Sequence, residues 1–147
     1  MKVDVTTFTD ITCPLAKVAA FSADPDHAPL WYKNIKSIVW KGSKHLGPGG
    51  KMDFVANFLG RRLAYTYEIV EWVPSQKLVM RTADGPFPME TTYTWQALSP
   101  DVTRMTLRNA GHPTGFSAFT APFMQWAMAK ANKKDLAALK KLLENKS

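Results

Sequence analysis

METTYTWQALSPDVTRMTLR, residues 89–108, contains two runs of alternating apolar and polar residues on either side of a short turn. Tyr93 and Trp95 alternate with polar residues in the first run, and Met105 and Leu107 do so in the second. Alternation with a period of two is typical of a β-strand that buries one face. The LSPD sequence between the runs is a turn signal, and so short a connection joins antiparallel strands. The stretch therefore predicts an antiparallel hairpin.

The same alternation extends towards the N-terminus through residues 36–42, 50–58, 61–72 and 77–82. Turn signals such as GPGG, VPSQ and DGPFP lie between these segments. Parallel strands would need crossovers of about a dozen residues or more. The six segments therefore predict an antiparallel meander.

One register explains five of these strands if the more apolar residue of each pair faces inward. The residues expected to face inward are Met52, Phe54, Ala56, Phe58, Leu63, Tyr65, Tyr67, Ile69, Leu78, Met80, Thr91, Tyr93, Trp95, Thr103, Met105 and Leu107. The residues expected to face water are Lys51, Asp53, Asn57, Arg62, Thr66, Glu68, Arg81, Glu90, Thr92, Gln96, Arg104 and Arg108.

The segments before and after the meander predict one strand and three helices. Residues 3–7 alternate as a strand does, and TCPLAKVAAFSAD, residues 12–24, predicts a helix with Pro14 at its first position. Asp24 and the proline after it are a start signal for a second short helix. Residues 112–147 predict a long helix, with Thr114 as its cap and Pro122 as a kink or early break. Its apolar stripe consists of Leu136, Leu139, Leu142 and Leu143.

Composition indicates one globular domain over residues 1–147, because 46% of the residues are hydrophobic and 21% are charged. No apolar run approaches the roughly 20 residues of a membrane span. The N-terminus also lacks the apolar run of a signal peptide, so we expect no transmembrane segment and a cytoplasmic location. The lone Cys13 excludes an internal disulfide and a metal site built from several cysteines.

The chain carries a net charge of +7, and much of the excess lies in the last predicted helix. Lysines follow helical spacing there while leucines take the other face, which we interpret as a solvated helix surface. We therefore expect no specific nucleic-acid binding. A surface for membranes or acidic proteins is the alternative interpretation. The lysines are Lys130, Lys133, Lys134, Lys140, Lys141 and Lys146.

The order of one strand, two short helices, a six-stranded meander and a long helix is that of a known α+β architecture. Three stretches resemble the START-like, helix-grip (SRPBCC) superfamily, and within it the bacterial polyketide cyclase/dehydrase-like group. They are ITCPLAKVAAFSADPDHAPLWYKNI, EIVEWVPSQKLVMRT and YTWQALSPDVTRMTLR. The resemblance covers essentially the whole chain. It implies a curved antiparallel sheet wrapped around the last helix. It also implies a cavity between them that commonly holds a lipid, sterol, polyketide or other apolar molecule.

That resemblance and the inward register together give a set of candidate ligand-binding residues. Tyrosines on a cavity wall can orient a carbonyl or hydroxyl of a ligand, or they can simply fill the core. Methionines leave the same two interpretations open. The candidates are Trp31, Phe54, Phe58, Tyr65, Tyr67, Met80, Tyr93, Trp95, Met105, Phe123, Met124, Ala127, Met128 and Ala131.

No catalytic residue for acid–base chemistry can be assigned from the sequence. His27, His45 and His112 stand at segment ends, and the strand glutamates either face outward or lie beside a turn. No metal or cofactor motif occurs. We interpret residues 24–35, DPDHAPLWYKNI, as a segment that packs at one corner of the cavity through Leu30, Trp31 and Ile35.

We therefore expect a monomer or weak homodimer that binds a small apolar ligand. The alternative is a polyketide cyclase- or dehydratase-like enzyme that acts in the same cavity.

Overall fold

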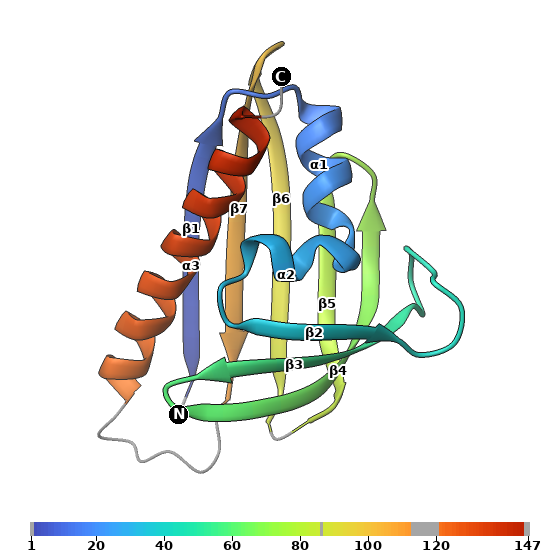
Figure 1. The fold of residues 1–147 in the computed structure, drawn as a ribbon, viewed down its shortest axis with the longest axis vertical. Helices are drawn as coiled ribbons and strands as arrows, with labels where there is room; N and C mark the ends of the chain where they lie inside the picture. The colour runs from blue at the N-terminus through green and yellow to red at the C-terminus, as the bar shows by residue number, and fades with distance from the viewer. Residues whose placement is uncertain (1, 86, 113–120, 146–147) are drawn as a thin grey trace.

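The computed structural model describes residues 2–85, 87–112 and 121–145. Within these residues, seven strands form an antiparallel sheet in the order β1-β7-β6-β5-β4-β3-β2. The expected α+β fold is confirmed (Figure 1). The strands are β1 (Val3–Ile11), β2 (Ile35–Trp40), β3 (Lys51–Phe58), β4 (Arg61–Val73), β5 (Lys77–Asp84), β6 (Met89–Ser99) and β7 (Val102–Gly111).

The hairpin expected from residues 89–108 forms in the expected register. Tyr93 lies opposite Leu107, and Trp95 lies opposite Met105. All four side chains are buried, so the alternation correctly marks the face that turns inward. The structure extends β7 to Gly111, because β1 pairs with it over its whole length, from Val3 opposite Gly111 to Ile11 opposite Thr103.

Thr66 differs from the register expectation, because it was expected to face water and is buried. It lies opposite Asp53 on the neighbouring strand, and its hydroxyl donates to Asp53 Oδ1 at 2.6 Å. The hydroxyl is therefore satisfied by a neighbour in place of water.

The first two helical segments lie close to where the sequence predicts them. Helix α1 (Leu15–Ala23) begins one residue later than expected, because Pro14 is extended and caps it. The second segment consists of η1 (Pro25–His27) and α2 (Ala28–Trp31), and Asp24 Oδ1 accepts from the Asp26 N–H at 3.0 Å. Leu30 was expected to pack at the cavity corner, but the helix turns it outward and it is 59% exposed.

Helix α3 (Ala121–Glu144) closes the chain. Pro122 lies in its first turn, where a missing N–H costs little, so it marks the start of the described helix. The expected cap, Thr114, and the last lysine, Lys146, lie outside the described residues. Lys140 is not a freely solvated lysine, because its ammonium donates to the Asp10 carbonyl and to Glu144 Oε2, both at 2.6 Å.

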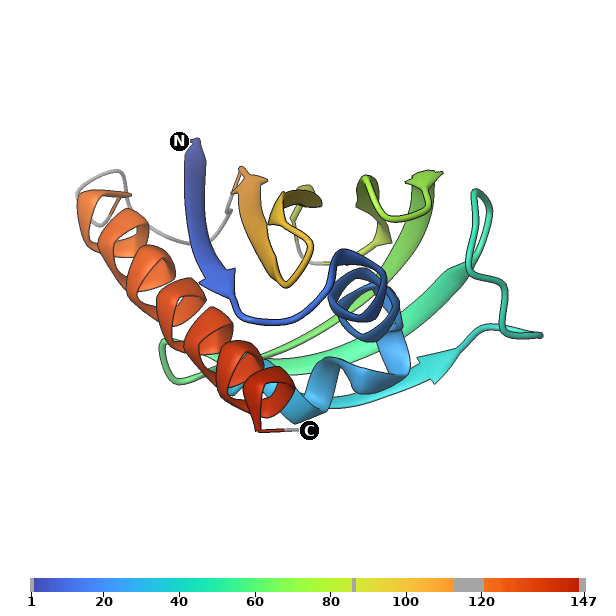
Figure 2. The ribbon, with the colours of Figure 1, turned by 90° about the horizontal axis from the view of Figure 1, so that it is seen from above.

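The sheet is strongly curved, and the helices lie on its concave side (Figure 2). Helix α3 runs along β1, whereas α1 packs over β6 and β7. Leu136, Leu139 and Leu143 of α3 join the main core, so the expected apolar stripe packs against the sheet. From Leu136 onwards α3 therefore meets a filled interior, and space remains beside the middle of the helix, at residues 128–135.

Candidate functional site

A cavity of about 140 Å³ lies between the concave face of the sheet and α3. Strands β3 to β7 form one wall, and the segment from the end of α1 to the start of β2 closes one end. Helix α3 contributes Met128, Ala131, Asn132 and Asp135. Their spacing of three, one and three residues places them on one face of the helix.

The cavity exists because the side chains on this face of α3 are short where the sheet opposite them curves away. The α3 side chains at the cavity include those of Ala131, Asn132 and Asp135, which are short, whereas Leu136, Leu139 and Leu143 pack into the core. On the sheet side, the rings of Phe54, Tyr65 and Tyr67 pack against one another with centroids 5.0–5.8 Å apart. A rigid aromatic wall therefore faces a helix that does not reach it.

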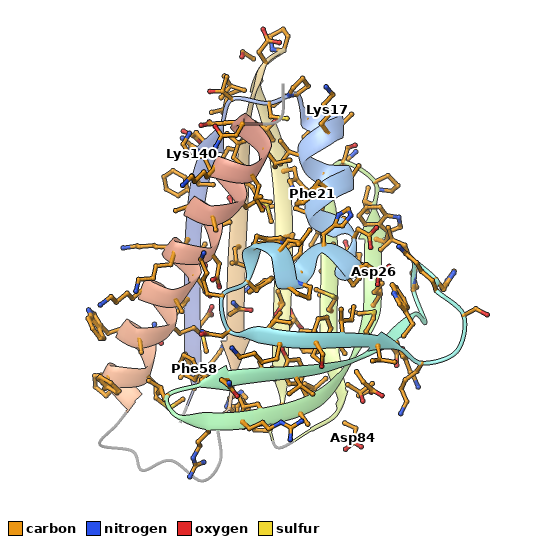
Figure 3. All side chains as sticks on the ribbon, in the orientation of Figure 1. Lys17, Phe21, Asp26, Phe58, Asp84 and Lys140 are labelled. Carbon is orange, nitrogen blue, oxygen red and sulfur yellow. The ribbon has the colours of Figure 1, made fainter. Side chains whose placement is uncertain are left out.

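At the β3–β4 hairpin the lining includes exposed Asn57 and half-buried Phe58 and Leu63. Figure 3 shows Phe58 at the end of β3 nearest to α3. There it packs against the small cluster of Val3, Val5 and Met124.

Of the candidate residues, those from the middle strands and the inward face of α3 lie on the cavity wall. They are Phe54, Phe58, Tyr65, Tyr67, Met80, Tyr93, Met128 and Ala131. The others do not line it, for reasons that alternation and helical spacing do not reveal. They are Trp31, Trp95, Met105, Phe123, Met124 and Ala127.

Trp95 and Met105 point inward at the end of the sheet that α1 covers, so they lie beneath that helix. The Trp95 indole N–H donates to Ser22 Oγ of α1 at 2.9 Å. Trp31 is likewise buried in the core, where it packs against the ring of Tyr32, and it is Tyr32 that reaches the cavity.

The three remaining exceptions belong to the first turns of α3. Phe123 is 54% exposed and stands beside Trp126 on the outer face of the helix. Met124 is buried against Val3 and Val5 of β1. Ala127 is half-buried and lies off the face that lines the cavity. The inward side of α3 thus reaches the cavity only from Met128 onwards.

A chain of polar side chains crosses the cavity wall from the sheet to α3. The hydroxyls of Tyr67 and Thr91 lie 2.8 Å apart, and the Thr91 hydroxyl donates to Asn109 Oδ1 at 2.6 Å. Asn109 Nδ2 then donates to Asn132 Oδ1 at 3.1 Å. The chain therefore ends on the amide group of Asn132, which is only 3% exposed.

Two further tyrosines form a hydroxyl pair in the lining, with the oxygens of Tyr32 and Tyr93 2.7 Å apart. Burial raises the pKa of both hydroxyls well above the ordinary value, and it raises the pKa of Tyr67 to about 12. At neutral pH these hydroxyls stay protonated, so each can donate one hydrogen bond.

Asp135 is the one acidic side chain that α3 contributes to the lining, and it is only 3% exposed. Its Oδ1 accepts the Lys33 backbone N–H at 3.0 Å, which ties α3 to the segment after α2. Burial raises the pKa of the carboxyl to about 6, and the Lys33 hydrogen bond opposes this rise. The cavity therefore holds a carboxyl that changes charge close to neutral pH.

The family model for "Polyketide cyclase / dehydrase and lipid transport" matches residues 2–144. The chain belongs to this family. The resemblance inferred from the sequence is therefore confirmed. Comparison with curated proteins gave no match.

Solved structures share the family fold at low sequence identity. The Zhui aromatase/cyclase from Streptomyces sp. R1128 has a TM-score of 0.81 at 12% identity, over 98% of this chain and 94% of that one. A START superfamily protein from Mycobacterium smegmatis has a TM-score of 0.81 at 13% identity, over 98% and 99% of the two chains. Major latex-like protein 151 from Panax ginseng has a TM-score of 0.73 at 10% identity, over 97% of each.

The histidines expected at segment ends lie outside the cavity lining. His27 stacks on Phe21, and its Nδ1 lies 2.8 Å from the Phe21 carbonyl oxygen. His45 Nε2 lies 3.2 Å from the Pro48 carbonyl oxygen, and His112 is exposed. In the described part of the chain, no three His, Cys, Asp or Glu side chains are grouped to hold a metal ion. No helix described is long and apolar enough to cross a membrane.

Asn132 and Asp135 were not among the residues predicted from the sequence, because carboxylates were expected on the strands and α3 was interpreted as an apolar stripe. Both residues nevertheless follow Met128 and Ala131 at inward helical spacing. Polar residues at core positions of an amphipathic helix are the signal that could have found them.

Asp135→Asn tests the electrostatics of the site. The variant keeps a side-chain oxygen for the Lys33 N–H but removes the charge. Because the pKa is raised from 3.8 to about 6, the native wild type binds more protons than the unfolded chain between these pH values. Its stability therefore falls as the pH rises from about 4 to about 6. At 1.36 kcal/mol per pKa unit, the charge on Asp135 lowers the free energy of unfolding by about 3 kcal/mol above that window.

Urea unfolding at pH 4 and pH 7 measures this effect. The two proteins should be similarly stable at pH 4, and the variant should be more stable at pH 7, by up to about 3 kcal/mol. Asp101→Asn, at the exposed turn after β6, is the control and should show no such change. A difference between Asp135→Asn and wild type that does not depend on pH would contradict the assignment.

Proposed function

We propose that this protein binds a small, mainly apolar molecule in the cavity between the sheet and α3. The observation that carries the proposal is the cavity itself, with aromatic and aliphatic walls and a few convergent polar groups. Pockets that recognise small molecules commonly combine these two features. Binding of a hydrophobic ligand and a cyclase role both fit the family.

The volume of the cavity bounds the part of the ligand that it encloses. An apolar cavity of about 150 Å³ takes up benzene, and this cavity measures about 140 Å³. One aromatic ring or a short aliphatic chain therefore fits inside. A longer molecule would extend beyond the cavity. A monomeric or weakly dimeric state and a cytoplasmic location stay predictions.

Met128→Trp tests whether the interior is hollow. Met128 is half-buried on the cavity wall, so a larger side chain there fills empty space instead of displacing packed atoms. The variant should keep a melting temperature within a few degrees of wild type, which corresponds to roughly 1 kcal/mol. It should lose the uptake of fluorobenzene that ¹⁹F NMR detects in the wild type.

Met124→Trp is the matched control one turn earlier in the same helix. Met124 is packed against Val3 and Val5 and does not line the cavity. Overpacking should therefore destabilise this variant by about 1 to 3 kcal/mol while fluorobenzene uptake remains. Equal destabilisation of both variants, with no uptake by the wild type, would mean that the interior is solid.

A second candidate function, proton transfer on the bound ligand, is favoured by Asp135. A carboxyl with a pKa of about 6 in a water-poor cavity is suited to act as a general base near neutral pH. The reaction class would be abstraction of a proton from the carbon next to a carbonyl group. The C–H pair would become the C=C bond of an enolate, and Asp135 would hold the proton.

Deuterium exchange at the methyl group of acetophenone in D₂O, followed by ¹H NMR, tests this candidate. The wild type should accelerate exchange over buffer, and Asp135→Asn should lose that acceleration at equal ligand occupancy. Exchange at the buffer rate in the wild type would contradict proton abstraction by Asp135 while leaving ligand binding intact.

A further inference from the structure

We infer that the ligand is an uncharged carbonyl compound whose oxygen is bound by Asn132 Nδ2 and by a hydroxyl of the Tyr32–Tyr93 pair. This inference rests on the proposed binding function and names the chemistry of the ligand's polar end. Three observations carry it: the direction of the polar chain, the unpaired proton of the tyrosine pair, and the charge of the lining.

The polar chain has a direction, because each hydroxyl holds one proton. Thr91 uses its proton on Asn109 Oδ1, so the Tyr67 hydroxyl must donate to Thr91. Asn109 Nδ2 donates to Asn132 Oδ1, which occupies the acceptor side of that amide. What remains at the end of the chain is the donor side, Asn132 Nδ2.

Asn132 Nδ2 is buried and has no hydrogen-bond partner among the described residues. Two other buried side-chain atoms there share this property, Thr7 Oγ1 and Trp31 Nε1, and neither belongs to the cavity lining. An unpaired buried donor is unfavourable, and a ligand that supplies an acceptor removes that penalty. The unmet donor thus belongs to a residue that lines the cavity.

The tyrosine pair supplies a second donor to the same cavity. The pair holds two hydroxyl protons, and the 2.7 Å bond between the oxygens uses one of them. The other proton is available to a ligand, since both hydroxyls belong to cavity-lining residues. Two donors can bind a single carbonyl oxygen, because that oxygen has two lone pairs.

The lining selects against an anionic acceptor. Among the described residues it includes no lysine, arginine or histidine, whereas Asp135 is an acid. A carboxylate ligand would lose its hydration without gaining an opposite charge, and it would approach Asp135. A neutral ketone or aldehyde meets the donors without this penalty.

Acetophenone and ethylbenzene have nearly the same shape and differ in the acceptor, so their dissociation constants report the hydrogen bond. We would titrate both into wild type and Asn132→Leu at pH 7 by NMR. We would then compare the ratio of the two dissociation constants between the two proteins. The hydration of each ligand is the same in both titrations, so it cancels in this comparison. The ratio should move by about tenfold against acetophenone in Asn132→Leu.

Met124→Leu is the control for the titration, because Met124 packs against Val3 and Val5 outside the cavity lining and its replacement should leave the ratio unchanged. A second measurement needs no variant. The carbonyl ¹³C shift of bound acetophenone should lie downfield of its value in an apolar solvent, as hydrogen bonding requires.

Benzoate should bind wild type at least tenfold more weakly than acetophenone.

The outcomes separate the two claims. An unchanged ratio in Asn132→Leu, a carbonyl shift equal to that in an apolar solvent, or benzoate binding as tight as acetophenone would overturn the inference while ethylbenzene still binds. If neither ethylbenzene nor acetophenone binds the wild type, the proposed function fails as well.

Discussion

The structure depends on how α3 covers the concave side of a curved sheet. A sheet with one apolar face must bury it, and here a single long helix and two short helices lie over that face. The leucines in the second half of α3 make a packed core with the sheet. The middle of the helix presents Ala131, Asn132 and Asp135 towards the same face, and these side chains are too short to fill the space.

The polar groups of the site follow from the same constraint. Asn132 and Asp135 are buried because they occupy inward positions of a helix that is held in place by its leucines. Each then needs partners, which Asn109 and the Lys33 backbone provide in part. The cavity and its unmet hydrogen-bonding capacity therefore arise together, in the layer of α3 where large apolar residues are missing.

Alternation predicts most of this fold because a period of two fixes which side chains face inward. It places Tyr67 and Tyr93 on the cavity wall correctly. It cannot distinguish them from Trp95, which has the same inward phase, because the position of α1 along the sheet decides which residues meet a helix and which meet space. The pairing of Tyr32 with Tyr93 joins residues 61 positions apart, and no local pattern encodes it. Polar residues at inward helix positions, here Asn132 and Asp135, are visible in the sequence and indicate the site better than the strand carboxylates do.

The central claim is that the space between the sheet and α3 is hollow and apolar, and xenon tests it most directly. Xenon enters apolar cavities of this size. A crystal of the protein pressurised with xenon should show an ordered xenon atom among Phe54, Tyr67 and Ala131. A well-ordered crystal that takes up no xenon there, with side chains in contact across that space, would contradict the account.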